Sequence, residues 1–189
     1  VAIEKECGRI LAQRAIRQTM DTIKAVGGHA TYHAVDVRDA DAFGAVVDSI
    51  YERHEHVDGV IHGAGIIEDK LLQHKTSESF SRVYETKVLG AQTLISRLRD
   101  DVGFVAFFSS VSGAFGNRGQ TDYAAANDAL DKLALSLNES LPGRIFSINW
   151  GPWGGAGMIS PELETEYNRR GIDLIDLDEG VAAFLDELS

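Results

Sequence analysis

The sequence has a single cysteine and no long apolar run, and both absences narrow what the protein can be. Cys7 alone cannot form an internal disulfide, so a reducing compartment such as the cytoplasm is expected. The apolar runs fall far short of the ~20 residues that a membrane-spanning helix needs. The first residues, VAIEKECGRI, are too charged for a secretory signal peptide. We therefore expect neither a membrane protein nor a disulfide-rich secreted domain.

Basic residues are also scarce relative to acidic ones. The 18 Lys and Arg residues stand against 29 Asp and Glu residues, which gives a formal net charge of −11 and a sequence pI of about 4.9. A nucleic-acid-binding protein needs a basic face, so a nucleic-acid partner is not expected. The acidity fits a solvated surface or, alternatively, a surface that meets a specific basic partner.

The sequence does contain a regular alternation of strand and helix patterns. Its 189 residues, 44% of them hydrophobic, suit one domain of ordinary size. Strands are expected where β-forming residues alternate or run together, over residues 29–37, 57–61, 104–108 and 145–150. Helices are expected over residues 10–26, 39–53, 77–98 and 123–141, with short ones near 161–170 and 178–188. This alternation predicts an α/β fold with a doubly wound parallel sheet.

The stretch over residues 104–127, FVAFFSSVSGAFGNRGQTDYAAAN, is the one around which the chain is organised. Its apolar run suits a buried parallel strand whose carboxyl end, at Ser110, opens into the ligand-binding edge of the sheet. A loop rich in Gly, Asn and Gln follows, and a helix is expected from about Tyr123. Tyr123 and Asn127 are four residues apart and so share one face of that helix. A hydroxyl, a phenol and an amide would then converge at one sheet edge.

A lysine falls on the apolar side of the helix expected over residues 77–98. At about 100° per residue, Lys87 lies roughly 60° from Tyr84, within the arc that faces the core. Two interpretations stay open. The ammonium either extends along the surface to reach solvent, or it is held by polar partners beside Ser110 and Tyr123.

Ser110, Tyr123, Lys87 and Asn127 would together make a site for carbonyl reduction. A phenol with an ordinary pKa of ~10 is a slow proton donor at neutral pH, and a nearby ammonium lowers that pKa. A serine hydroxyl holds the carbonyl oxygen beside the phenol, so that the carbon accepts a hydride from a nicotinamide. The asparagine holds a water that relays the proton. Taken singly, each residue has an ordinary interpretation: a turn cap for Ser110, a core aromatic for Tyr123, and a polar helix start for Asn127.

The spacing of Ser110 and Tyr123 resembles the site of the short-chain dehydrogenase/reductase family. Most of that family has a lysine four residues after the tyrosine, where this chain has Asn127. The presence of the lysine at Lys87 instead is similar to the ketoreductase domains of type I polyketide synthases. The segments YETKVLGAQTL, FFSSVSGAFGNRGQTDYAAAN and SINWGPWGGAGMISPEL resemble most the ketoreductases of polyunsaturated fatty acid and enediyne synthases. The resemblance covers roughly residues 34–163.

The resemblance implies an NADPH-dependent reduction of a β-ketoacyl thioester on an acyl carrier protein, with other synthase domains as partners. Tyr123 would donate the proton, Ser110 would polarise the carbonyl, Lys87 would lower the phenol pKa and bind ribose, and Asn127 would support the relay. Two alternatives stay open: a free-standing carbonyl reductase of the same superfamily, and a catalytically silent domain of a synthase. A buried lysine kept together with the other three residues argues against the silent domain.

Cofactor contacts are implied in three further segments. The pair Asp36-Val37, at the end of the strand expected over residues 29–37, would touch the adenine. The run His62-Gly63-Ala64-Gly65 would line the cofactor cleft, where small residues allow close backbone approach. The run Gly151-Pro152-Trp153 would face the nicotinamide. A simple turn or cap is the alternative for each segment, and no metal is expected.

Three residues are implied in substrate handling and stereochemistry. Ile67-Glu68-Asp69 stands where B-type ketoreductases carry Leu-Asp-Asp, so the final Asp69 is kept. Phe115 occupies the position of the tryptophan of A-type domains, eight residues before the tyrosine. This pattern predicts a hydroxyl product of D configuration, although Arg118 replaces a proline usual in B-type domains. Met158 would belong to a lid over the substrate.

The chain contains no G-x-G-x-x-G phosphate loop, which the family carries between its first strand and first helix. By the resemblance, residues 29–37 are the third strand and 57–61 the fourth, and the order 3-2-1-4-5-6 places the first two strands between them. We therefore expect residues 1–189 to be a single but incomplete ketoreductase domain. Polypeptide outside them would fill the gap and supply the loop. The segment that reads a 2′-phosphate is also absent, so NADPH rather than NADH rests on the resemblance alone.

Overall fold

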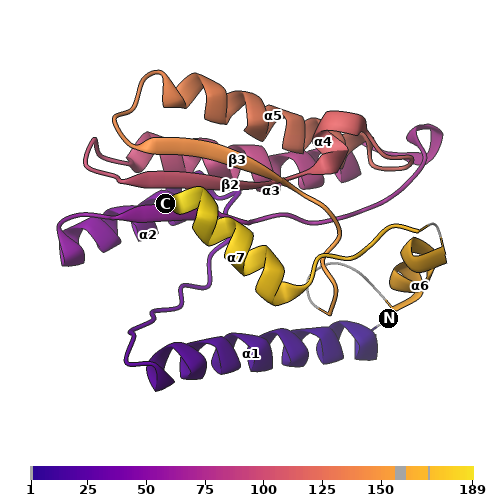
Figure 1. Ribbon diagram of the computed structural model, residues 1–189, viewed down its shortest axis with the longest axis horizontal. Helices are drawn as coiled ribbons and strands as arrows, with labels where there is room; N and C mark the ends of the chain where they lie inside the picture. The colour runs from indigo at the N-terminus through magenta and orange to yellow at the C-terminus, as the bar shows by residue number, and fades with distance from the viewer. Residues whose placement is uncertain (1, 156–160, 170) are drawn as a thin grey trace. The chain divides into compact units, whose positions relative to one another are not determined.

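The computed structural model describes residues 2–155, 161–169 and 171–189, and the chain divides into two compact units. The first unit is Val1–Val35 and the second is Asp36–Ser189. Figure 1 labels most of the helices and strands of the two units.

The first unit contains one long helix, α1 (Ala2–Ala25). The helix is followed by Gly27, which has a φ of 85°, a left-handed conformation that glycine adopts without strain. The Gly28 amide then donates to the Ile23 carbonyl at 2.9 Å, a bond typical of a glycine-terminated helix. The helix predicted over residues 10–26 is therefore confirmed, and it begins earlier than predicted.

The strand predicted over residues 29–37 is wrong, because these residues form neither a helix nor a strand. The alternation that indicated a strand is a local pattern, whereas a strand exists only when a neighbour completes its hydrogen bonds. No other described segment pairs with these residues, and in particular they do not pair with the strand predicted over residues 57–61. Filling of the gap by polypeptide outside the chain stays a prediction.

The second unit is built on three parallel strands in the order β1-β2-β3. These are β1 (Gly59–His62), β2 (Phe104–Ser110) and β3 (Arg144–Trp150). Both pairs of neighbouring strands are parallel. Gly59 of β1 lies opposite Phe104 of β2, and Phe104 lies opposite Arg144 of β3. The result is an open α/β sheet, as predicted, and its carboxyl ends meet at one edge.

Helices connect and follow the strands. The long ones are α2 (Ala40–His54), α3 (Ser77–Arg97) and α5 (Thr121–Asn138), and α6 (Pro161–Arg169) and α7 (Leu177–Leu188) come last. Asp39 and Thr76 cap α2 and α3 by accepting from the amides of Ala42 and Ser79. All five were predicted within a few residues. The sequence did not predict the short α4 (Val111–Phe115) or the 3-10 turn η1 (Leu72–His74).

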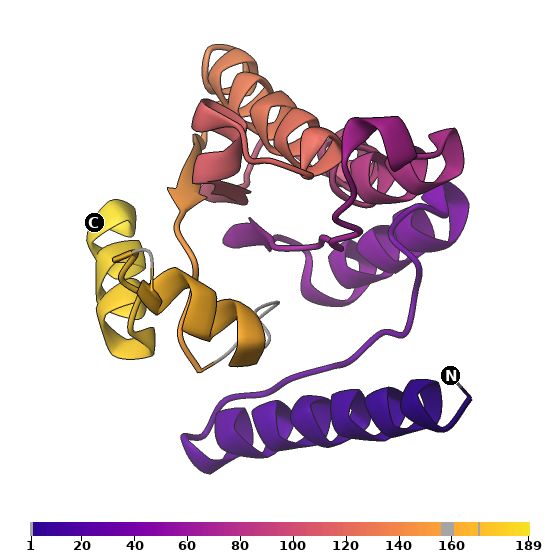
Figure 2. The ribbon, with the colours of Figure 1, turned by 90° about the vertical axis from the view of Figure 1, so that its right-hand side faces the viewer.

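The main core lies between the sheet and the pair α3 and α5. Alternate residues of β2 point into it, and Val105 and Phe107 are completely buried there. They pack with Ala91 of α3, Leu130 of α5 and other apolar side chains. Figure 2 shows α3 and α5 on one side of the sheet and α7 on the other. On the α7 side the Phe108 ring meets the Phe184 ring at 5.6 Å, edge to face.

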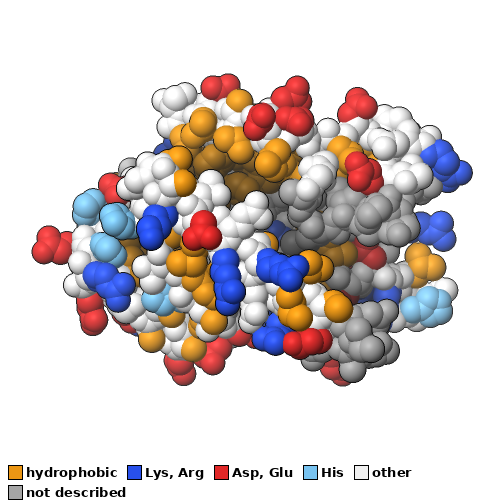
Figure 3. All heavy atoms as spheres, turned by 90° about the horizontal axis from the view of Figure 1, so that it is seen from below, with side chains coloured by type: hydrophobic (Ala, Val, Ile, Leu, Met, Phe, Trp, Pro, Cys, Tyr) orange, Lys and Arg blue, Asp and Glu red, His pale blue; other side chains and the backbone are white. Residues whose placement is uncertain are grey.

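The face of the molecule drawn in Figure 3 shows no strongly basic region. In Figure 3, acidic and basic side chains are interspersed, with hydrophobic side chains between them. Among the helices of the described residues, none has both the length and the apolar character needed to cross a bilayer.

Candidate active site

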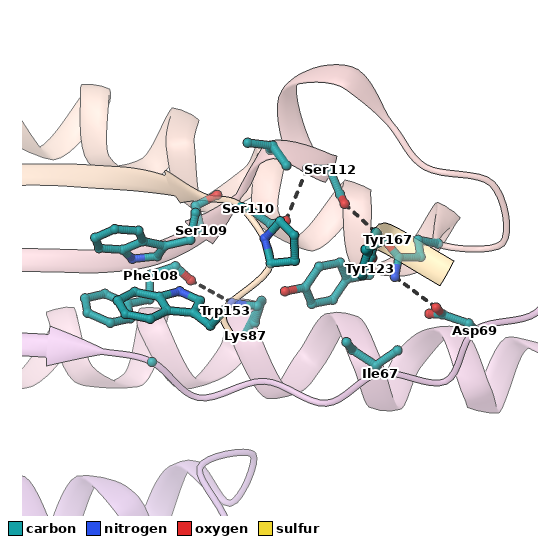
Figure 4. A pocket seen from close by; sticks show the side chains of 16 residues that line it. Ile67, Asp69, Lys87, Phe108, Ser109, Ser110, Ser112, Tyr123, Trp153 and Tyr167 are labelled. Carbon is teal, nitrogen blue, oxygen red and sulfur yellow. Dashed lines mark hydrogen bonds between the residues drawn. The ribbon is translucent and has the colours of Figure 1, made fainter. Parts of the chain in front are cut away.

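A pocket opens where β2 and β3 end, at the carboxyl edge of the sheet. Its volume is about 310 Å³. Figure 4 shows the side chains that line it, which come from the strand ends, from α3, α4, α6 and the start of α5, and from the segments after β1 and β3. The lining includes Ser110, Tyr123 and Lys87, three of the four residues predicted to act together. The convergence predicted from the spacing is thus present for these three side chains.

Ser110 is both a helix cap and part of the pocket wall. It is the last residue of β2, and its Oγ accepts a hydrogen bond of 3.2 Å from the Ser112 amide at the start of α4. The residue is 8% exposed, and it lines the pocket. The ordinary interpretation as a cap is therefore correct, and it fixes the hydroxyl at the pocket without removing it.

Tyr123 lies in the first turn of α5, and its hydroxyl points toward the Lys87 side chain (Figure 4). The Lys87 Nζ is 5.7 Å from the centre of the Tyr123 ring. Burial raises the pKa of the Tyr123 phenol, while the polar groups of Ser110 and Asn127 act in the opposite direction. The sequence predicted a lowered pKa. Burial outweighs these hydrogen bonds in this structure, because charge on the phenol would lie in a largely desolvated site.

Lys87 is buried, with 3% of its surface exposed, so the interpretation in which the ammonium reaches solvent is wrong. Its Nζ donates a hydrogen bond of 2.8 Å to the Phe108 carbonyl of β2. Burial lowers the pKa of Lys87 from 10.5 to about 8, and the Asp131 carboxylate opposes this shift. At neutral pH the side chain is therefore still mostly an ammonium, held beside the phenol.

Asn127 lies behind Tyr123 and outside the described pocket lining. It is completely buried, and its Nδ2 donates to the Tyr123 carbonyl at 2.7 Å. The Asn127 carbonyl in turn accepts from the Ser109 hydroxyl at 3.2 Å, which joins this turn of α5 to the end of β2. Its buried Oδ1 accepts no hydrogen bond from the described residues. Asn127 thus fixes the backbone of Tyr123 and keeps one free acceptor.

The segments predicted to contact the cofactor lie in different places. Gly63 and the run Gly151-Pro152-Trp153 line the pocket, whereas Ala64 and Gly65 are not part of its described lining. The His62 imidazole turns inward and bonds to the Lys87 carbonyl. Asp36 is held in a turn: its carboxylate pairs with Arg38 at 2.6 Å, which lowers its pKa to about 2. Val37 approaches Gly90 of α3.

The residues predicted to control stereochemistry also separate. Asp69 lines the pocket, and its Oδ2 accepts from Gln120 Nε2 at 2.9 Å (Figure 4). Phe115, at the end of α4, is 86% exposed and is not part of the described lining. Met158 lies outside the described residues.

Several lining residues were not predicted from the sequence. Gln120 accepts at its Oε1 from Ser112 and from Asn117, both at 3.0 Å, and so joins α4 to the Asp69 segment. In the sequence, only the position of Gln120 just before a predicted helix start could have indicated that it lies near the site. Tyr167 of α6 also lines the pocket, and no local pattern marked it.

Comparison with known proteins identifies the family. A family model described as a KR domain matches residues 7–155, which is most of the chain. The chain belongs to the KR domain family. KR domains are oxidoreductase domains that bind nicotinamide cofactors.

Two curated relatives of this KR domain chain are synthases. It is 37% identical over 181 residues to one of the subunits of the polyunsaturated fatty acid synthase of Thraustochytrium sp. (strain ATCC 26185 / S-3), a match that covers 95% of the chain and 6% of that protein. It is 36% identical over 166 residues to polyketide synthase PksM of Bacillus subtilis (strain 168), with 86% and 4% covered. The chain therefore spans a small part of the relatives that it matches.

Solved structures agree with this assignment. The ketoreductase from the first module of phoslactomycin biosynthesis in Streptomyces sp. HK803 matches with a TM-score of 0.83 and 34% identity over 88% of this chain and 38% of that one. An N-terminal ketoreductase from the macrolactin assembly line matches with a TM-score of 0.82 and 28% identity, covering 93% and 35%. A short-chain dehydrogenase from Mycobacterium avium shares the fold, at 22% identity, a TM-score of 0.64 and coverage of 70% and 52%.

The pocket fits the reactive end of a nicotinamide cofactor. A side-chain carbon added at Gly63 would meet only the edge of Phe108, at 3.9 Å, so the backbone there is open to close approach. Flat aromatic walls stand nearby, with the Trp150 and Trp153 rings 4.8 Å apart. Lys87 provides a cationic donor within the same wall. The pyrophosphate end would need a glycine-rich loop that this sequence lacks.

Proposed function

We propose that this KR domain chain reduces a β-ketoacyl thioester, carried on an acyl carrier protein, to a β-hydroxyacyl thioester with NADPH. The observation that supports the proposal most is the meeting of Ser110, Tyr123 and Lys87 in one pocket of a KR domain. The synthase relatives support the acyl carrier protein and the other synthase domains as partners. The single free Cys7 fits a reducing, cytoplasmic setting.

Each side chain has a part in the proposed reaction. The bound nicotinamide would supply the hydride. Ser110 would hold the substrate oxygen by a hydrogen bond, and Tyr123 would deliver its phenolic proton to that oxygen as negative charge develops there. Lys87 would stabilise the resulting phenolate, since its ammonium is already fixed on the Phe108 carbonyl. Asn127 Oδ1 is buried and has no donor among the described residues. It would accept a hydrogen bond from the water that relays a proton back to Tyr123.

Burial of Tyr123 fits a proton donor rather than a stored phenolate. Its raised pKa keeps the phenol protonated until charge develops on the substrate oxygen. We propose that binding of the cofactor and substrate brings Lys87 and the phenol into closer electrostatic contact.

A second proposed role concerns the configuration of the product: Asp69, fixed by Gln120 at the pocket wall, would favour the D product.

The test uses the complete polypeptide that carries this chain, because we propose that residues outside 1–189 supply the missing strands and phosphate loop. The enzyme is assayed with NADPH and a β-ketoacyl N-acetylcysteamine thioester. Turnover is expected, with a faster rate when the acyl group is carried on the carrier protein and with mainly D product by chiral analysis. No turnover would favour the silent domain, and no gain from the carrier would favour a free-standing reductase.

Replacement of the proton donor tests the mechanism. Tyr123→Phe is expected to lower kcat by about 10²–10⁴-fold, the usual contribution of general acid catalysis, with NADPH affinity nearly unchanged. A variant that keeps more than a tenth of the wild-type kcat would remove Tyr123 from the proposed role.

A further inference from the structure

His62 is buried at the carboxyl end of β1, and its imidazole faces α3 instead of the pocket. It is 4% exposed, and its Nε2 lies 2.9 Å from the Lys87 carbonyl oxygen. A carbonyl can only accept a hydrogen bond, so Nε2 carries the hydrogen and donates it. The imidazole is therefore fixed to the backbone of the lysine proposed to act in the reaction.

Lys87 is consequently held at both ends by the sheet. Its backbone carbonyl receives the His62 hydrogen bond from β1, and its Nζ donates to the Phe108 carbonyl of β2 at 2.8 Å. Within a helix a carbonyl already faces the amide four residues ahead, and its second lone pair leaves room for the imidazole. Two adjacent strand ends thus define where this turn of α3, and the ammonium it carries, can lie.

The packing around the imidazole leaves it little freedom. A side-chain carbon added at Gly90 would come within 3.2 Å of His62 Cε1 and of Val37, so glycine permits the close approach of α3. The Phe107 ring lies edge-on to the imidazole, with ring centres 6.0 Å apart. Burial lowers the pKa of His62 to about 4, which keeps the imidazole neutral at the pH of the cell.

We propose that His62 is a positioning residue for Lys87: through its hydrogen bond to the Lys87 carbonyl it sets the place of the ammonium relative to Tyr123. This inference rests on the proposed function of Lys87. The proposed role of the imidazole differs from the cofactor contact that the sequence predicted for His62-Gly63-Ala64-Gly65. Of that segment, Gly63 lines the pocket.

Two substitutions separate the hydrogen bond from the volume of the side chain. His62→Phe keeps a flat ring and removes the donor, whereas His62→Gln keeps a donor at a similar distance from the backbone. Both are made in the complete polypeptide. The first readout is the rate at which acetic anhydride modifies Lys87, measured by peptide mass spectrometry without cofactor. Lys132, whose side chain is 69% exposed, is the internal reference.

In the wild type, Lys87 should react much more slowly than Lys132, because it is buried and hydrogen-bonded. In His62→Phe we expect Lys87 to react at least ~5-fold faster than in the wild type, with Lys132 unchanged. The second readout is turnover, where His62→Phe should lower kcat by roughly 10–100-fold, the effect of a small misplacement of a catalytic group, with little change in the KM of the thioester. His62→Gln should restore both readouts to within ~3-fold of wild type.

Unchanged Lys87 modification in a folded His62→Phe variant would overturn the proposal, and so would a His62→Gln variant as defective as His62→Phe. If His62→Phe does not fold, Gly90→Ala places a methyl group of α3 against the imidazole, next to the atom that donates to Lys87. Faster Lys87 modification in that variant supports the proposal, and an unchanged rate overturns it. Absence of turnover in the wild type would refute the proposed function, while the modification readout would still report on His62.

Discussion

Among the residues that the structure describes, two lysines have buried ammonium groups, and the surroundings of the two differ. The Lys75 side chain, just before α3, is 3% exposed and pairs with the Asp122 carboxylate at 2.7 Å, with the Glu68 carbonyl as a second acceptor. Lys87, in the middle of α3, is also 3% exposed, but its ammonium donates to the neutral carbonyl of Phe108. One charge is neutralised by a partner and the other is only solvated by the backbone.

The difference separates a structural lysine from one that is proposed to act in catalysis. The desolvation cost of a buried charge is offset when a counter-ion pairs with it. A buried ammonium without an ion-paired carboxylate instead lowers the free energy of unfolding. That destabilisation appears in the lowered pKa of Lys87, about 8. An ammonium that is not ion-paired is useful next to a phenol where negative charge must form, because the Asp131 carboxylate offsets its field only in part.

The largest effect is expected from Lys87→Met, which removes the charge and keeps most of the volume. We expect kcat to fall by about 10²–10⁴-fold, since the phenolate loses its stabilising cation. The free energy of unfolding should stay equal or increase, because an unpaired buried charge is removed. Steady-state kinetics and urea unfolding measure the two quantities, with Lys132→Met as the exposed control. A clear loss of stability would show that Lys87 is structural after all.

Lys75→Met should have the opposite signature. It leaves the Asp122 carboxylate buried and unpaired, which costs about 3–5 kcal/mol of stability. Activity should fall only as far as the folded fraction falls, which urea unfolding followed with an activity assay can establish. The double variant Lys75→Met with Asp122→Leu should recover most of the stability, since neither charge remains. A double variant no more stable than Lys75→Met would contradict the assignment of the loss to the orphaned carboxylate.

The destabilisation caused by the buried Lys87 ammonium should depend on pH. Below about pH 8 the lysine is protonated in both the folded and unfolded chain, and the destabilisation is fully present. Between about pH 8 and 10.5 the folded chain binds fewer protons than the unfolded chain, so the free energy of unfolding rises with pH. Relative to Lys87→Met, the gain should be on the order of 2–3 kcal/mol. A flat difference between the two proteins from pH 7 to 10.5 would argue against a depressed pKa.

The smallest effect is expected from Asp131→Asn in α5. The Asp131 carboxylate raises the pKa of Lys87 against the effect of burial, and its Oδ1 is buried without a hydrogen bond to the described residues. Removing its charge should lower the pKa of Lys87 further, so that kcat declines at a lower pH on the alkaline side. We expect a displacement of less than about one pH unit, read from the kcat profile. A displacement toward higher pH would contradict this electrostatic role.

Local pattern was sufficient to predict most elements and the key position of Lys87. The helical period placed Lys87 in the buried arc of α3, and the spacing of Tyr123 and Ser110 predicted their meeting at the sheet edge. These features depend on periodicity and on the rule that parallel strands present their ends together.

Features that depend on distant partners could not be predicted. The alternation over residues 29–37 was that of a strand, but hydrogen bonds to a neighbouring strand decide whether one forms. The inward turn of His62 depends on the close approach of α3 at Gly90. The Lys75–Asp122 pair joins residues 47 apart, and no local signal marks it. The pKa of Tyr123 depends on how deeply the folded chain buries it.

The segment that carries Asp69 is braced from several sides. Glu68 accepts from Ser79 and Arg82 of α3, and the Lys70 amide donates to the Gly119 carbonyl. Lys75 and Gln120 complete the attachment to α5. For protein engineering, this makes the segment a poor cassette on its own. Transplanting it into a reductase to test the proposed role of Asp69 in product handedness would require its anchoring residues to be moved with it.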